Sequence, residues 1–295
     1  MQSVQRATIA VLTYNRREQV LQTLKALMGL PGEWPIIVID NGSVDGTPAA
    51  VAQCFPSVKM ITVQTNIGAA ARNLAVAQLE TPYVAFSDDD TQWEPRALEK
   101  AVQILDAAPT VAVVSGCVLV GEGRMLDPTC KDMEQSPLPK DGLPGPQLLG
   151  FMAGACVMRA QAFNDVGGYW APFFIGGEEE LMALDLVDKG WRIIYAKDVI
   201  SRHFPSRLRD ASLRKKLLIR NTIWVAWMRR PWAVVLRETA WQLREARKRH
   251  ILWPVIIQTA RGLPSAMTQR KTVSSYVEAM KRQLDQSRNH SRTVT

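Results

Sequence analysis

The segment that decides the fold is PYVAFSDDD, residues 82–90, an apolar run that ends in three consecutive aspartates. The apolar half predicts a short buried strand, so Asp88, Asp89 and Asp90 are expected at its C-terminal end, where α/β folds place their ligands. Adjacent carboxylates repel one another, and Mg²⁺ or Mn²⁺ relieves that repulsion while binding phosphate oxygens. The alternative is a solvated acidic turn or a helix N-cap before Glu94-Pro95.

The first two-thirds of the chain alternates strand and helix signals. Short apolar runs rich in β-branched residues predict strands over residues 7–12, 35–40, 58–63, 83–86 and 111–116. Amphipathic spacing between them predicts helices over residues 17–28, 69–79 and 94–107. This alternation predicts an α/β fold with a mostly parallel sheet flanked by helices.

Polar residues follow three of the predicted strands. Right-handed crossovers bring the ends of the first, second and fourth strands to one edge, where three motifs would meet: Thr13-Tyr14-Asn15-Arg16, Asp40-Asn41-Gly42-Ser43 and Asp88-Asp89-Asp90. Asp40 can accept a hydrogen bond from a ribose hydroxyl or a base N–H, although Asn41-Gly42 alone could be only a turn. The sequence therefore predicts one polar crevice.

The loop from Asn66 to Asn73 opens a further predicted helix, whose N-terminus can face an anion. It lacks the glycine patterns of a P-loop and of a dinucleotide site. ATP hydrolysis and NAD redox chemistry are therefore disfavoured.

Composition excludes a disordered or collagen-like chain, since 47% of the 295 residues are hydrophobic. The four cysteines show no CxxC spacing, which favours a reduced, cytosolic-facing protein. Residues 1–8 show no basic-then-apolar signal segment, so we expect a cytoplasmic protein that is not exported.

Charge is divided unevenly along the chain. Residues 201–295 hold 21 Lys/Arg against 5 Asp/Glu, a net +16, whereas residues 1–200 hold 15 against 23, a net −8. Five of the nine tryptophans also lie in the basic part. Two interpretations stay open, an anionic membrane surface at the inner face of the cell membrane and a helical cap with a solvated basic face; nucleic-acid binding ranks below both.

Prolines shape the predictions for two other regions. Residues 121–149 contain five of them and predict a long irregular insertion that acts as a lid or acceptor-binding element. Residues 213–228 predict an amphipathic helix, after which Pro231, Pro254 and Pro264 predict a division into short helices. The longest uncharged apolar stretch, residues 251–260, is about half of the roughly 20 residues that a membrane-spanning helix needs.

Five motifs in order resemble family 2 glycosyltransferases of the GT-A fold, including rhamnosyltransferase-like members. They are Thr13–Arg16, Val38–Thr47, Asn66-Ile67-Gly68 with Arg72-Asn73, Asp88–Asp90 with Trp93 and Pro95, and Gly167–Tyr169 with Phe173–Gly177 and Glu178-Glu179-Glu180. The resemblance covers roughly residues 5–230 and includes His203 and Arg220-Asn221.

The resemblance implies a metal-dependent hexosyl- or deoxyhexosyltransferase. Such an enzyme moves a sugar from a nucleoside-diphosphate sugar, here a UDP- or dTDP-sugar, to an acceptor hydroxyl with inversion, in glycan or glycolipid synthesis on a glycan or lipid-linked acceptor. It further implies a GT-A catalytic domain over residues 1–210, with a nucleotide-sugar half (1–116) and an acceptor half (150–210), followed by a basic helical region, 211–295.

The same resemblance implies roles for individual residues. Substrate-binding positions are Thr13, Asn15, Arg16, Asp40, Asn66, Gly68, Arg72, Asp88, Glu178 and His203, and metal ligands are Asp88 and Asp90. Asp90 is the first choice for Mg²⁺ or Mn²⁺, Asp88 would lie nearer the ribose, and His203 would contact metal or diphosphate.

An acidic pair at a helix N-terminus supplies the family's general base, and the register against Leu184-Asp185-Leu186 puts its second member at Glu179. The alternative is an acidic first turn that complements the helix dipole. Leu181 stands where many relatives carry another acid. This departure leaves open a nucleotide-sugar-binding protein without catalysis. A second rival is a sugar-1-phosphate nucleotidylyltransferase, although no GxGxR-like nucleotide loop follows the first strand.

Overall fold

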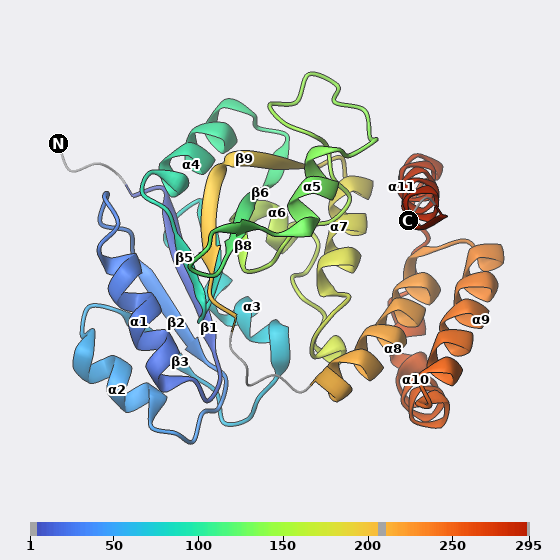
Figure 1. Ribbon diagram of the computed structural model, residues 1–295, viewed down its shortest axis with the longest axis horizontal. Helices are drawn as coiled ribbons and strands as arrows, with labels where there is room; N and C mark the ends of the chain where they lie inside the picture. Colours follow the sequence, from blue (N-terminus) through green and yellow to red (C-terminus); the bar gives the residue numbers. More distant parts are fainter. Residues whose placement is uncertain (1–4, 206–210, 294–295) are drawn as a thin grey trace.

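The computed structural model describes residues 5–205 and 211–293. Helices surround a central sheet, and α8 to α11 gather at the end of the molecule away from α1 and α2 (Figure 1). The predicted domain boundary after residue 210 falls beside residues 206–210, which lie outside the description, as do residues 1–4 of the N-terminus. The division into domains stays a prediction.

Within the described residues, nine strands form one sheet in the order β3-β2-β1-β4-β8-β6-β9-β5, with β7 paired to β6. The strands are β1 (Ala7–Thr13), β2 (Ile36–Asp40), β3 (Lys59–Thr62), β4 (Tyr83–Asp88), β5 (Thr91–Trp93), β6 (Val111–Val120), β7 (Met125–Leu126), β8 (Ala155–Arg159) and β9 (Arg192–His203). Six strands run in one direction, namely β1, β2, β3, β4, β6 and β9, and three run in the other, namely β5, β7 and β8. The predicted mostly parallel α/β sheet is confirmed.

All five predicted strands are present because each is a buried or half-buried apolar run with a local signature. The strand β9 was not predicted, since exposed Lys197 and Asp198 interrupt its apolar pattern. These residues lie in β9 where its pairing with β6 shifts register, between Gly116 and Cys117. Such an irregularity lets charged side chains leave the sheet without ending the strand.

The helices are α1 (Arg17–Met28), α2 (Thr47–Cys54), α3 (Arg72–Val76), α4 (Ala97–Ala107), α5 (Pro128–Glu134), α6 (Ala160–Asp165), α7 (Glu178–Asp188), α8 (Ala211–Arg229), α9 (Trp232–Lys248), α10 (Leu252–Thr268) and α11 (Ser275–Thr293). Two 3₁₀ turns, η1 (Gly68–Ala71) and η2 (Ala171–Phe173), precede α3 and α7. The predicted helices over residues 17–28 and 213–228 are confirmed.

Two predictions from proline were wrong. The insertion over residues 121–149 contains α5, because Pro128 occupies the first helical position, where no N–H is needed. The Asp127 side chain accepts from the Thr129 amide at 2.8 Å and caps this helix. Pro264 lies inside α10 and does not divide it. The helix continues to Thr268, and the turn after the proline packs against the protein through Ala266, which is fully buried.

Ion pairs join the C-terminal helices to α7, and one further pair joins α11 to the end of α8. Arg229 pairs with Asp185, with Nη2 2.8 Å from Oδ2, and Lys281 Nζ lies 2.9 Å from Glu180 Oε1. Arg230 and Glu278 form a buried pair at 2.6 Å. Part of the positive charge of this region is therefore used in a helical cap, as one of the two interpretations predicted.

None of the helices in residues 5–205 and 211–293 combines the length and apolar character that crossing a bilayer requires.

Candidate active site

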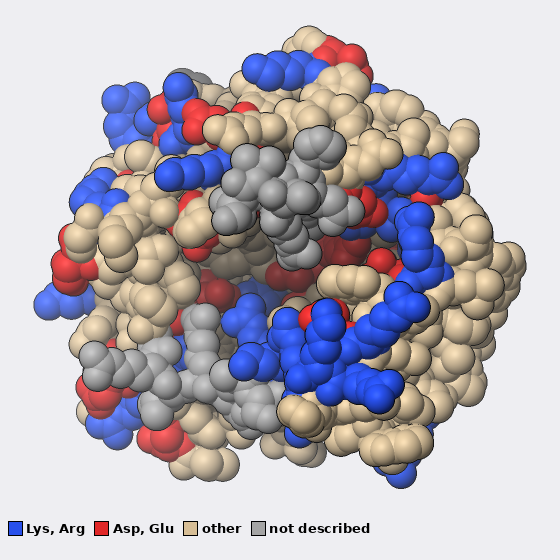
Figure 2. Space-filling model, turned by 45° about the vertical axis from the view of Figure 1, so that its right-hand side comes forward, with Lys and Arg blue, Asp and Glu red and all other residues tan. Residues whose placement is uncertain are grey.

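A cavity of about 760 Å³ opens where β1 and β4 end, between the sheet and the N-terminal ends of α7 and α8. Figure 2 shows this hollow with carboxylates on its floor and lysines and arginines beside its opening. The parallel register explains the location, because β4 pairs with β1 along its length and brings Asp88 opposite Leu12. The predicted meeting of polar strand ends is thus observed, since β2 also ends here, with Asp40 opposite Thr13 and Asn41 lining the same cavity.

Asp89 fastens the start of α1 to the end of β4. Its carboxylate accepts from Thr13 Oγ1 at 3.0 Å and from Arg16 Nη1 at 2.7 Å, and its backbone carbonyl accepts from Thr23 Oγ1 at 2.7 Å. Burial, partly offset by the charge of Arg16, raises the pKa of Asp89 to about 6. The middle aspartate therefore holds the framework of the cavity together.

Asp90 lies next to His203 although the two are distant in sequence. Antiparallel pairing of β5 with β9 sets Thr91 opposite His203, and Phe204 donates its amide to the Asp90 carbonyl at 2.8 Å. As a result His203 Nε2 lies 3.4 Å from Asp90 Oδ1, and Arg16 Nη1 lies 3.2 Å from Asp90 Oδ2. The carboxylate is fully buried, while the imidazole is 22% exposed at the cavity.

Asp88 is the most open of the three aspartates, with 40% of its side chain exposed, and it forms an ion pair with Arg72 of α3. The Arg72 side chain is only 6% exposed and lies over the Phe86 ring, 5.9 Å from its centroid. Gly154 makes room for this pair, because a Cβ there would lie 2.5 Å from Asp88 Oδ2. The Phe86 ring on the Arg72 side and the Gly154 backbone on the Asp88 side therefore hold this ion pair in place.

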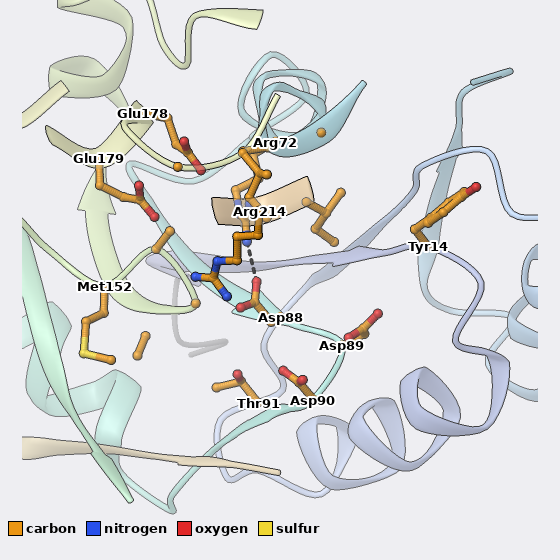
Figure 3. Close-up of a pocket in the computed structure, with 18 of the residues that line it drawn as sticks. Tyr14, Arg72, Asp88, Asp89, Asp90, Thr91, Met152, Glu178, Glu179 and Arg214 are labelled. Atoms are coloured by element: carbon orange, nitrogen blue, oxygen red, sulfur yellow. Dashed lines mark hydrogen bonds and ion pairs between the residues drawn. The ribbon is translucent and has the colours of Figure 1, made fainter. Parts of the chain in front are cut away.

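The three glutamates at the start of α7 face two ways. Glu178 and Glu179 point from α7 toward Arg72 and Asp88 (Figure 3), whereas Glu180 binds Lys281 of α11. Burial first, and then the charge of Glu178, raise the pKa of Glu179 to about 8, against the opposing effects of the helix amide and Arg72. The first helical turn therefore brings two carboxylates, Glu178 and Glu179, to the cavity.

The segment Phe173–Gly177, which leads into α7, is held by α8. The Asn221 side-chain amide, fully buried, donates to the carbonyls of Phe173 and Ile175 at 3.0 Å each and also to that of Gly176. Arg220 Nη2 donates to the Phe173 carbonyl at 2.8 Å and its guanidinium stacks on Trp224, 4.2 Å from the ring centroid. Two neighbouring side chains of α8 thus fix the entry to the glutamates.

Most of the predicted site residues line the cavity: Thr13, Arg16, Asn66, Gly68, Arg72, Asp88, Asp90, Glu178, Glu179 and His203. Asn15 and Asp40 are not among them. Asp40 is fully buried and accepts from the Ser43 amide at 3.0 Å, while Asn15 Oδ1 accepts from the Val44 amide at 2.8 Å. Both order the turn after β2, and their contact with a nucleotide stays a prediction.

Several residues of the cavity are not among the predicted site residues: Tyr14, Asn41, Met152, Gly154 and Arg214. Tyr14 and Asn41 belong to motifs that were predicted to meet in the crevice, and the buried Asn41 side-chain amide donates to the Gly68 carbonyl at 3.0 Å. Met152 and Arg214 come from a loop and from α8, where nothing local marks a site.

The donor set suits a hard divalent cation that arrives with a diphosphate. Among the described residues, no three His, Cys, Asp or Glu side chains are grouped to hold a metal by themselves. Asp88, Asp90 and His203 do face one cavity. Since Mg²⁺ is commonly bound by one or two carboxylates together with substrate phosphates, these residues fit such an ion.

Comparison with known proteins agrees with this arrangement. The family model described as Glycosyl transferase family 2 matches residues 8–167. A curated relative from Mycobacterium tuberculosis, described as N-acetylglucosaminyl-diphospho-decaprenol L-rhamnosyltransferase, is 24% identical over 213 residues, which make up 59% of this chain and 68% of the relative.

Two solved structures share the fold. Residues 1–349 of TarS from S. aureus, in complex with UDP-GlcNAc, give a TM-score of 0.65 at 17% identity, covering 93% of this chain and 83% of that one. The mannosyltransferase PcManGT from Pyrobaculum calidifontis, in complex with GDP-Man and Mn²⁺, gives 0.57 at 19% identity, covering 96% and 86%. These neighbours show the GT-A fold, and because the family model spans more than half of the sequence, the chain belongs to glycosyl transferase family 2.

Proposed function

We propose that this glycosyltransferase moves a hexosyl or deoxyhexosyl group from a nucleoside-diphosphate sugar to an acceptor hydroxyl, with inversion and with help from Mg²⁺ or Mn²⁺. The observation that carries the proposal is the joining of two kinds of carboxylate in one cavity. Asp88 and Asp90 lie at one wall, and Glu179, with a pKa raised to about 8, lies at the other.

The donor diphosphate would lie against Asp88, Asp90 and His203. Asp90 and Asp88 would hold the divalent ion, with Asp88 nearer the ribose, and His203, 3.4 Å from Asp90, would contact the ion or the diphosphate. When bound, that ion supplies positive charge where the departing diphosphate becomes more negative. Thr13, Arg16, Asn66, Gly68 and Arg72 would shape the nucleotide pocket, with Asn15 and Asp40 ordering its outer turn.

Glu179 would be the general base. The acceptor oxygen attacks the anomeric carbon, its proton passes to the Glu179 carboxylate, and the bond from that carbon to the β-phosphate oxygen breaks. A single displacement of this kind inverts the anomeric centre. A carboxylate whose pKa lies near neutral pH is a stronger base than an ordinary one and is still partly ionised, which suits this task.

The donor proposed is a UDP- or dTDP-sugar, and the acceptor a glycan or a lipid-linked glycan. The names of similar proteins support a nucleotide-sugar donor and a lipid-linked acceptor. One solved neighbour holds UDP-GlcNAc, and the curated relative is named for a decaprenol-linked substrate. An acceptor of this kind would require the protein to work in the cytoplasm, at the inner face of the cell membrane, in cell-envelope glycan synthesis.

Screening thermal stability against nucleoside-diphosphate sugars, with and without Mn²⁺, tests this proposal, because a ligand that binds the folded state raises the melting temperature. We expect one donor to stabilise the protein only with the cation, and transfer or donor hydrolysis to follow. Binding without either reaction would instead identify a nucleotide-sugar-binding protein. Release of pyrophosphate from a nucleoside triphosphate would identify a nucleotidylyltransferase.

The metal assignment has its own test. Asp90→Asn should remove Mn²⁺-dependent affinity for the nucleoside diphosphate, measured by calorimetric titration, and abolish transfer. Asp141→Asn, on an exposed loop, is the control and should change neither. Unchanged affinity and turnover in Asp90→Asn would exclude Asp90 as a ligand.

A further inference from the structure

Helix α10 presents an apolar stripe to solvent. Trp253 is 71% exposed and Ile257 47% exposed, and Ala260 and Pro264 continue the stripe at helical spacing. An exposed tryptophan followed by three more apolar positions on the same face of a helix is unusual for a surface that meets only water.

The opposite face of α10 already has its partner. Val255 and Ala266 are fully buried, the Thr259 carbonyl accepts from Trp224 Nε1 at 3.1 Å, and Gly262 lies against the Trp224 ring. Because this inner face fixes the rotation of the helix on α8, the stripe cannot turn inward.

Positive charge accompanies the stripe. The run Arg247-Lys248-Arg249 ends α9 and directly precedes α10, and residues 232–268 hold six Lys/Arg against two Asp/Glu, a net +4. A helix that is apolar on one side only, with tryptophan and basic residues at its end, suits the headgroup boundary of an anionic bilayer. Charge complementarity therefore favours a lipid surface over a second, equally basic copy of the chain.

The stripe belongs to the same helical unit as the opening of the cavity. Val255 near the start of α10 packs with Ile219 and Ile223 of α8 in one buried cluster. Nearer the start of α8, Leu213 and Leu218 line the cavity and are 42% and 40% exposed. The helix that carries exposed apolar side chains at the cavity is thus packed directly against α10.

We propose that α10 lies in the surface of an anionic membrane through Trp253, Ile257, Ala260 and Pro264, with Arg247, Lys248 and Arg249 contacting lipid phosphates. Docked in this way, the protein presents the cavity opening at α8 to acceptors held in the bilayer. The docking itself rests on α10 alone, and only this orientation rests on the proposed function.

Co-sedimentation of the full chain with vesicles tests the docking. We expect binding to vesicles of equimolar phosphatidylcholine and phosphatidylglycerol, little binding to phosphatidylcholine alone, and release by salt, which screens the attraction. Replacing both large side chains, Trp253→Ser with Ile257→Ser, should weaken partitioning at least about tenfold, since each loses an apolar group that the bilayer would bury.

Matched variants separate the contribution of the apolar stripe from that of the basic residues. Met28→Ser removes a 48% exposed side chain at the end of α1 and should sediment like wild type. Exchanging Arg247, Lys248 and Arg249 for Gln should remove the preference for anionic lipid. The proposal is overturned if wild-type protein stays in the supernatant at low salt, if the Trp253/Ile257 variant sediments like wild type, or if that variant changes only the oligomeric state.

Failure of docking and failure of the proposed function are distinguishable. Donor binding with Mn²⁺ in solution, without vesicles, should be the same for wild type and the Trp253/Ile257 variant, because neither residue lines the cavity. Equal melting temperatures confirm that the variant folds.

Discussion

The backbone amide of Ala69 donates a hydrogen bond of 2.7 Å to the backbone carbonyl of Phe174. Ala69 lies in η1, between β3 and α3, on the side of the cavity that we propose binds the donor, and Phe174 lies in the segment that leads to Glu179. This contact joins the two halves directly, so the position of the proposed base depends on a loop that is distant in sequence. The close approach requires Gly68, because a Cβ there would lie 1.9 Å from the Phe174 oxygen.

Gly68→Ala should therefore displace the segment that carries Phe174 and lower transfer by at least about tenfold, with a loss of roughly 1–3 kcal/mol in stability. Gly121→Ala is a matched control, since both glycines have φ of +68° but a Cβ at Gly121 would meet nothing within 4 Å. Thermal unfolding and transfer rates of the two variants check this. Equal effects would mean that backbone strain alone, and not the contact with Phe174, is responsible.

Asn221→Ala should leave the carbonyls of Ile175 and Gly176 without their side-chain donor, whereas the Phe173 carbonyl keeps its bond from Arg220. A buried carbonyl that loses its donor costs about 1–3 kcal/mol in stability. We expect a lower transfer rate at saturating donor with nearly unchanged donor affinity, because the segment positions α7 and not the nucleotide pocket. Thr222→Ala changes the half-buried neighbour on α8, whose hydroxyl bonds only to Leu218 of the same helix, and should leave both quantities unchanged. Intact transfer in Asn221→Ala would show that α8 does not position the base.

The raised pKa of Glu179 predicts how stability depends on pH. In the folded protein this carboxyl releases its proton around pH 8, whereas in the unfolded chain it does so near the ordinary pKa of 4.5. Between these values the folded state binds more protons, so wild-type stability falls as pH rises. Glu179→Gln lacks this loss, and its melting temperature relative to wild type should climb from pH 4.5 to 8 and then level off.

Glu180→Gln is the control for that pH series. Glu180 is paired with Lys281 outside the cavity, so its replacement should lower the melting temperature without a rising difference over the same range. A constant difference between Glu179→Gln and wild type would show that the Glu179 carboxyl has an ordinary pKa.

Local patterns predicted the elements that carry the cavity but not the contacts between them. Thr13 and Asp88 were predicted at one edge because each ends an apolar strand, and parallel strands share an edge. The approach of His203 to Asp90 depends on the pairing of β5 with β9, and β5 is too short to have a signature of its own.

The contribution of α8 was hidden for a similar reason. Asn221 binds the Phe173 carbonyl across 48 residues, and a helix sequence does not show which loop lies beside it. The sign of the pKa shift at Glu179 also required the structure, since burial and the helix N-terminus act in opposite directions and only packing decides between them.

The most direct test of the central claim is the single-turnover rate of transfer at saturating donor for Glu179→Gln, with Glu178→Gln and Glu180→Gln measured alongside. The account predicts that Glu179→Gln retains donor affinity and loses about 10²–10⁴-fold in rate, the usual contribution of a positioned general base, while the other two lose much less. A dead Glu178→Gln with an active Glu179→Gln would move the base by one residue. Unimpaired rates in all three would contradict the assignment of catalysis to this end of α7.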